Sequence, residues 1–178
     1  MEVKSTIKYI VVVIGIVIAS FLLQTVVFPH LELAGVAPNF LVIVTTSFGM
    51  MRGRRQGMLV GFSCGLLLDF FSGSVLGLYA LLYLYLGYLS GFFKKIFFGD
   101  DLKLPLILIG SSDIIYGIIV YIVLFLFRKQ YNIGFYLTSV ILPETVYTVL
   151  VSIPIYYLIL EINRWLDKDD KRSSRSLV

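Results

Sequence analysis

Histidine and cysteine are nearly absent from this sequence, which has one of each among its 178 residues. Cys64 has no second cysteine to pair with, and His30 stands just after the first apolar run, where an interfacial residue is expected. Nucleophilic catalysis needs a base beside the nucleophile, and a metal site needs several ligands at suitable spacing. The sequence supplies neither, so we expect no catalytic residues, no metal, no cofactor and no enzymatic activity.

Charged residues are also scarce. They make up 15% of the chain, whereas 58% of the residues are hydrophobic and the mean hydropathy is +0.92. Soluble domains carry about 25% charged residues, so this composition is typical of an integral membrane protein. A helix needs about 20 apolar residues to cross a hydrocarbon core of about 30 Å, and the chain length therefore allows about six crossings with no soluble domain.

Apolar runs and the residues that break them divide the chain into helices. Pro38 opens the second run, and Pro143 and Pro154 are expected to bend the last helix. Residues 1–165 would form one transmembrane domain, followed by a short polar cytoplasmic tail at 166–178. The predicted fold is all-α, a compact bundle of six transmembrane helices at about residues 7–28, 38–51, 56–71, 75–93, 104–127 and 135–160.

The distribution of Lys and Arg predicts the orientation in the membrane. If the N-terminus is inside, every Lys and Arg except Arg128 and Lys129 lies in a cytoplasmic segment. Because cytoplasmic loops retain basic residues, both termini are expected in the cytoplasm. The net charge of +4 is then explained by topology and by attraction to anionic lipid, and no nucleic-acid partner is expected.

Glycine recurs along the third predicted helix. Gly53, Gly57, Gly61 and Gly65 are spaced every four residues, and Gly87 and Gly91 form a second row on the fourth helix. Small residues let helix backbones approach closely in a membrane, where van der Waals contact stabilises the pairing. These rows predict close packing, either within the chain or against another protein.

Asp69 takes the next place in the glycine series and is followed by Ser72, Gly73 and Ser74. The fourth helix begins shortly afterwards, and a helix N-terminus presents unpaired N–H groups and partial positive charge. Ser72 or Ser74 could cap the same helix end. Two interpretations stay open: a polar latch that joins the third and fourth helices, or a buried site reached from outside.

Two further acids, Asp113 and Glu144, are expected near the membrane midplane, each about 14 Å from one surface. A charged acid at that depth costs about 2.5 kcal/mol or more, so each should be protonated, hydrogen-bonded or paired with a polar neighbour. Gly110 and Gly117 share the helix face of Asp113, and Thr148 shares that of Glu144. The two acids could tie the fifth and sixth helices together, relay protons or contact a partner.

The stretch DFFSGSVLGLYAL, from Asp69 through Gly77 to Leu81, follows directly on the glycine series. Together they resemble the central signature of the MreD family of rod shape-determining proteins. The similarity extends over about residues 20–165, with Thr148 in a place where relatives often have Asn. Further motifs fall in matching order: Pro38-Asn39-Phe40, the basic turn Arg52-Gly53-Arg54-Arg55, and Pro143-Glu144.

This resemblance implies a multi-pass protein of the bacterial cytoplasmic (inner) membrane that acts in cell shape. Its expected partners are MreC, through that protein's single transmembrane helix, and, directly or through MreC, the actin-like filament MreB. These proteins belong to the cell-elongation complex, whose glycosyltransferase-transpeptidase pair synthesises peptidoglycan and is a further expected partner, directly or through MreC. The family is further similar in fold to the substrate-binding subunits of energy-coupling-factor vitamin transporters, six-helix proteins with a pocket at the extracellular side.

Two functions compete. The first is a non-enzymatic scaffold of the elongation complex, for which the Gly87/Gly91 row and the rim around Asp69 are the expected MreC contacts. The second is a vitamin-binding transporter subunit, whose outward pocket would be lined by Tyr79, Tyr83, Tyr131 and Tyr136. The structural and partner-contact candidates are Pro38, Asn39, Gly57, Gly61, Gly65, Asp69, Ser72, Gly73, Ser74, Gly77, Gly87, Gly91, Asp113, Glu144 and Thr148.

Overall fold

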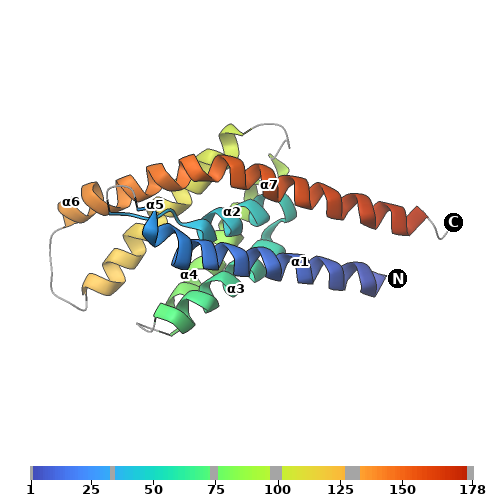
Figure 1. Ribbon diagram of the computed structural model, residues 1–178, viewed down its shortest axis with the longest axis horizontal. Coiled ribbons are helices and arrows are strands. Elements are labelled where there is room, and N and C mark those ends of the chain that lie inside the picture. Colours follow the sequence, from blue (N-terminus) through green and yellow to red (C-terminus); the bar gives the residue numbers. More distant parts are fainter. Residues whose placement is uncertain (1, 33–34, 73–75, 97–101, 127–132, 176–178) are drawn as a thin grey trace.

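The computed structural model describes residues 2–32, 35–72, 76–96, 102–126 and 133–175, and this part of the chain is helical with no β-strand (Figure 1). The first half contains α1 (Glu2–Leu22), a π-helical turn (Leu23–Val27), a 3-10 turn (Phe28–His30), α2 (Phe40–Arg52) and α3 (Arg54–Ser72). The second half contains α4 (Leu78–Ser90), a 3-10 turn (Gly91–Lys95), α5 (Lys103–Leu126), α6 (Ile133–Tyr136), a π-helical turn (Leu137–Ile141) and α7 (Leu142–Arg175).

Three helical segments are long and apolar enough to cross a membrane: Ile7–His30, Lys103–Val123 and Gly134–Asp167. The helix Phe40–Arg52 is apolar but shorter. These findings confirm the all-α fold. The helices also overlap each of the six segments that the sequence predicts.

Several helix ends differ from the predicted ones: α1 begins at Glu2 instead of residue 7, and α4 begins at Leu78 instead of residue 75. The second helix begins at Phe40, two residues after Pro38, because the Asn39 side chain caps it by accepting a hydrogen bond from the Val42 backbone N–H at 3.2 Å. The last helix continues to Arg175, well beyond the expected end at residue 160, and contains Pro154 within it.

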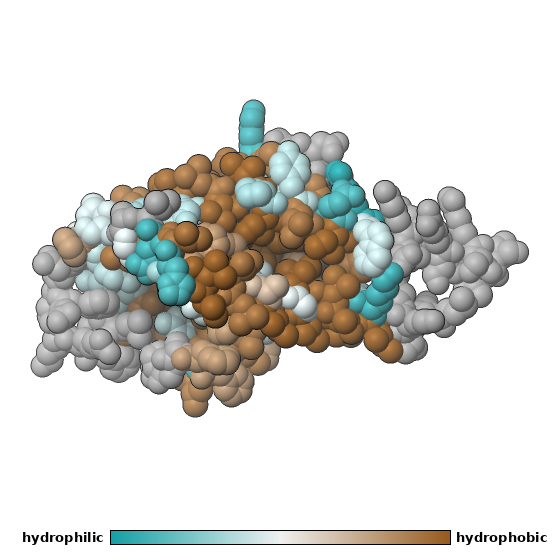
Figure 2. Space-filling model, in the orientation of Figure 1, coloured by the Kyte–Doolittle hydropathy of each residue, from teal (hydrophilic) through white to brown (hydrophobic). Residues whose placement is uncertain are grey.

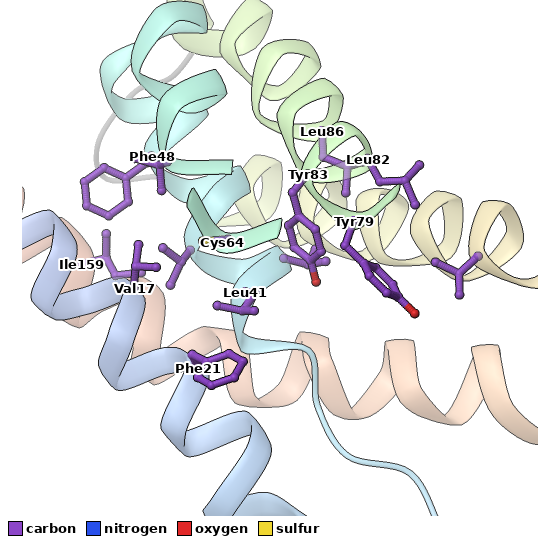
Figure 3. Close-up of a cluster of buried hydrophobic side chains, with 14 residues drawn as sticks. Val17, Phe21, Leu41, Phe48, Cys64, Tyr79, Leu82, Tyr83, Leu86 and Ile159 are labelled. Carbon is purple, nitrogen blue, oxygen red and sulfur yellow. The ribbon is translucent and has the colours of Figure 1, made fainter. Parts of the chain in front are cut away.

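The short helix α2 lies at the centre of the bundle. All its residues from Phe40 to Met50 are buried, and it packs against α1, α3, α4, α5 and α7. Figure 3 shows Leu41 and Phe48 of α2 among Val17 of α1, Tyr83 of α4 and Ile159 of α7. Since neighbouring helices surround α2, it does not need the length of a helix that faces lipid on its own.

On the face shown in Figure 2, hydrophobic residues cover most of the middle of the molecule. Leu59 of α3, Ile107 of α5 and Leu158 of α7 each expose more than half of their surface. Such a surface suits lipid hydrocarbon, in which apolar side chains need no burial within the protein.

One end of the bundle is rich in cations. We call it the basic end, and it comprises Arg52, Arg54, Arg55, Lys94 and Lys95. The Lys94 ammonium donates to the Arg52 carbonyl at 3.0 Å, which joins the α2–α3 turn to the residues after α4. The N-terminal end of α1 and the C-terminal end of α7 project on this same side (Figure 1), where the Lys8 ammonium lies 3.9 Å from the centre of the Trp165 ring.

Candidate functional site

A row of glycines brings the backbones of α3 and α4 into direct contact. We call it the glycine seam, and its members are Gly57, Gly61, Gly65, Gly87 and Gly91. A Cβ atom at Gly61 would overlap the Tyr83 carbonyl, and one at Gly57 would overlap the Gly87 carbonyl. Any side chain at these positions would therefore force the two helices apart, which confirms the predicted role of the series in close helix packing.

The seam also corrects one expected partner contact. Gly87 and Gly91 are buried, and a Cβ at either position would overlap the backbone of Gly57 or Arg54 on α3. The sequence left open whether this row faces the same chain or another protein. Because α3 already covers it, the row is not an open surface for the helix of another protein.

Asp69, the next member of the series, joins the same two helices through its carboxylate. Oδ1 accepts a hydrogen bond from the Tyr79 backbone N–H at 3.0 Å, and Oδ2 accepts one from the Ala80 N–H at 2.9 Å. The carboxylate is 3% exposed and serves the first turn of α4, where Gly77 stands at the N-cap with a φ of 92° and no capping side chain. Asp69 of α3 therefore caps the N-terminus of α4, a role that a residue at the start of the helix itself usually fills.

These contacts support the latch interpretation, since both carboxylate oxygens bind α4. The residues around the latch are described only in part. Gly73 and Ser74 lie outside the described residues, and for Ser72 the structure describes only the backbone, as the last residue of α3. The predicted capping by a serine therefore stays a prediction.

Asn39 connects three helices near the middle of the bundle. Its Oδ1 caps α2 and also accepts a hydrogen bond from the Tyr83 hydroxyl of α4 at 2.9 Å. Its backbone N–H donates to Thr148 Oγ1 of α7 at 3.0 Å. All three residues are buried, as is Pro38 beside them, so the Pro38-Asn39 pair is held inside the protein.

Asp113 of α5 meets this network from another side. It is 2% exposed, and the polar side chains of Asn39, Thr145 and Thr148 lie beside its carboxyl group. Within the part of the chain that the structure describes, neither carboxyl oxygen makes a hydrogen bond of good geometry. A Cβ at Gly110 would touch Val149 of α7, so α5 and α7 pack closely on the face that carries Asp113.

Glu144 of α7 lies near Asp113 and also near Tyr116 and Tyr136. The fold therefore brings the two predicted intramembrane acids into one region. We call this region the central polar cluster, and its members are Asn39, Tyr83, Asp113, Glu144, Thr145 and Thr148. It joins α2, α4, α5 and α7.

A comparison with protein families now decides the class of the chain. A family model described as rod shape-determining protein MreD matches residues 4–166. The chain belongs to the MreD family. It is a membrane protein of a structural family that determines rod shape and is not known as a family of enzymes.

Searches of curated proteins and of solved structures gave no match to this MreD-family chain. The expected likeness in fold to vitamin-transporter subunits is therefore unsupported. Two of the tyrosines predicted to line an outward pocket, Tyr79 and Tyr83, are buried inside the bundle, and Tyr83 is bonded to Asn39. Tyr131 lies outside the described residues, and the Tyr136 ring packs 4.6 Å from the Tyr121 ring.

The basic end of this MreD-family chain has a contact network that the sequence analysis missed. Arg52 Nε donates to Asn163 Oδ1 at 2.8 Å, and its guanidinium forms an ion pair with Asp167 at 2.9 Å. The guanidinium also lies 5.1 Å from the centre of the Tyr9 ring. Arg52 thereby fastens α7 and α1 to the end of α2, whereas in the sequence it stands out only as one of several basic residues.

Proposed function

We propose that this MreD-family protein is a non-enzymatic scaffold of the cell-elongation complex. In this role it binds the transmembrane helix of MreC and helps couple MreB to lateral peptidoglycan synthesis by the glycosyltransferase-transpeptidase pair. The observation that carries the proposal is the inward direction of the polar groups. Asp69, Asn39 and Asp113 all face other helices of the chain, which makes the body a preorganised frame with an apolar exterior.

The proposed topology is multi-pass, with both termini in the cytoplasm of the bacterial inner membrane. Three long apolar helices and the clustering of cations at the basic end support it. Basic residues are retained on the cytoplasmic side, so the basic end would face the cytoplasm and the α3–α4 connection the outside. The projecting ends of α1 and α7 would then stand on the side where MreB assembles.

The apolar rim beside Asp69 is the proposed contact for MreC. The rim comprises Phe70, Phe71 and Leu76, of which Phe71 is 74% exposed and Leu76 79% exposed. Large side chains that stand this far out next to a fixed helix end can pack into the grooves of a second transmembrane helix. The latch beneath them holds the rim in place, because Asp69 immediately precedes Phe70 and Phe71.

Co-purification with full-length tagged MreC from membranes tests this proposal. The double variant Phe71→Ala/Leu76→Ala should lose most of the bound MreC, and cells that depend on it should become round. Ile107→Ala, which shortens an equally exposed side chain on α5, is the matched control and should leave both unchanged. Equal recovery of MreC with the double variant and the wild type would refute the rim, and no recovery with the wild type would refute the scaffold.

A further inference from the structure

An apolar groove runs between α1 and α3. It consists of two hollows of about 240 and 310 Å³, which share Val13, Ile14 and Ser63 and are therefore continuous. The groove extends from Tyr9 and Gln56, near the basic end, to Phe70 beside the rim. Along α3 this distance corresponds to about 21 Å at 1.5 Å per residue.

The shape of the groove favours a flexible chain over a helix. A helix of about 10 Å diameter would rest above hollows of about 240 and 310 Å³ and insert only one row of side chains, whereas a thin acyl chain can lie along their whole length. An empty trench in hydrocarbon would forfeit dispersion contacts along both walls. Its length exceeds the half-thickness of a hydrocarbon core, about 15 Å, so an acyl chain that starts at the membrane surface can lie along it.

A cation marks the end of the groove nearest the basic end. Arg55 is exposed, and Leu59 and Leu66, which line the groove, follow it on the same helix face. Among the described residues Arg55 has no hydrogen-bond or ion-pair partner, whereas Arg52 is paired with Asp167.

A polar side chain completes the same end. Gln56 Oε1 accepts a hydrogen bond from the Tyr9 hydroxyl at 3.1 Å. Its amide NH₂ group is a donor of the kind that a phosphate oxygen accepts. The groove thus has apolar walls along its length and a cation with a neutral donor at one end, which is the pattern that a phospholipid of negative charge would complement.

We propose that this groove binds one anionic phospholipid. The headgroup phosphate lies at Arg55 with Gln56 beside it, and an acyl chain follows the groove past Ile14 and Ser63 towards Phe70. The lipid fills the gap between α1 and the rest of the bundle, so α1 is fastened to α3 by a bound lipid as well as by protein contacts. Lipid binding here does not require MreC or depend on the direction in which the chain crosses the membrane, although the far end of the groove shares Phe70 with the rim.

Native mass spectrometry of the delipidated full-length protein tests the site. Phosphatidylglycerol and phosphatidylcholine with identical acyl chains are added in turn, and retained lipid is counted per chain. One cation near a lipid surface corresponds to about a fivefold preference for the anionic lipid. The wild type should show this preference at one lipid per chain, and Arg55→Gln should abolish it.

Two further variants make the result specific. Arg54→Gln removes the same charge one residue away, but the Arg54 guanidinium lies 3.6 Å from the Phe92 ring centre on the α4 side, so this control should keep the preference. Ser63→Trp fills the groove and should lower retention of both lipids. Ile14→Trp, from the opposite wall, repeats that measurement if Ser63→Trp does not give a monodisperse protein.

Three outcomes would overturn the proposal. An equal effect of Arg54→Gln and Arg55→Gln would show diffuse charge attraction instead of a site. Unchanged lipid retention in both tryptophan variants would place the lipid elsewhere on the surface. If the tryptophan variants lose MreC but retain lipid, the groove binds a protein helix and not a lipid. The opposite result, loss of lipid with MreC retained, would support the lipid site and leave the scaffold proposal intact.

Discussion

Replacing Asp69 should weaken the junction of α3 and α4 in two measurable steps. The carboxylate accepts hydrogen bonds from two backbone amides, those of Tyr79 and Ala80, at a helix start where Gly77 offers no capping side chain. Asp69→Asn keeps one acceptor oxygen and places an NH₂ group against the other amide. The loss of one charge-assisted hydrogen bond should lower the free energy of unfolding by about 2 kcal/mol.

Asp69→Leu removes both acceptors and leaves two buried N–H groups without partners. Each unsatisfied buried donor costs about 1–3 kcal/mol, so the free energy of unfolding should fall by about 4 kcal/mol in total. Equilibrium unfolding in mixed micelles gives both values, with Glu161→Gln on the exposed face of α7 as a control that should change little.

The shape of cells that carry these variants provides a second readout. Cells should keep rod form with Asn at position 69 and lose it with Leu, since hydrogen bonding is retained in part only by Asn. Equal stability of the Leu and Asn variants would refute the reasoning. It would mean that the two amides find other acceptors and that Asp69 does not fasten α4.

Three further substitutions test other contacts that hold the helices together. Gly61→Leu should prevent recovery of folded, monodisperse protein, because its side chain would overlap the Tyr83 backbone, whereas Gly15→Leu, whose Cβ meets no atom within 4 Å, should be recovered normally. Tyr83→Phe removes the bond to Asn39 and should lower the free energy of unfolding by about 1 kcal/mol in the same micelle assay. Arg52→Gln breaks the ion pair with Asp167, so limited proteolysis should cleave the C-terminal end of α7 faster, and added salt should shrink the difference between variant and wild type.

Local sequence patterns were sufficient to predict the contacts between neighbouring helices. Glycine spacing placed Asp69 on the face of α3 that meets α4, and the start of α4 lies only a few residues further along the chain. The roles of Gly87 and Gly91 could not be decided in this way. A row of small residues has the same pattern whether its partner helix belongs to the same chain or to another protein, and only the packed structure shows that α3 covers it.

Contacts between distant segments could not be predicted. The sequence analysis placed the start of the second helix at Pro38 and did not identify Asn39 as its cap, and the other partners of Asn39, Tyr83 and Thr148, come from helices much later in the chain. The arrangement of Arg52 with Asn163 and Asp167 is hidden for the same reason. The two acids Asp113 and Glu144 were expected at similar depth, but which helices meet there is a property of the fold.

Because polar residues lie inside the bundle and apolar residues outside, variants of this protein should fall into two groups: those that lower stability and those that lower MreC binding. Asp69, Asn39 and Asp113 act on the stability of the frame, so substitutions there should reduce MreC binding only as far as they unfold the protein. Leu76 is 79% exposed, and its replacement by Ala should change the free energy of unfolding by less than about 0.5 kcal/mol. The Phe71 ring lies 5.0 Å from the Phe21 ring of α1, so Phe71→Ala should lower the free energy of unfolding by about 1 kcal/mol. A Leu76→Ala variant that loses both stability and MreC would contradict this division, because the rim would then belong to the fold and not to a surface that receives a partner.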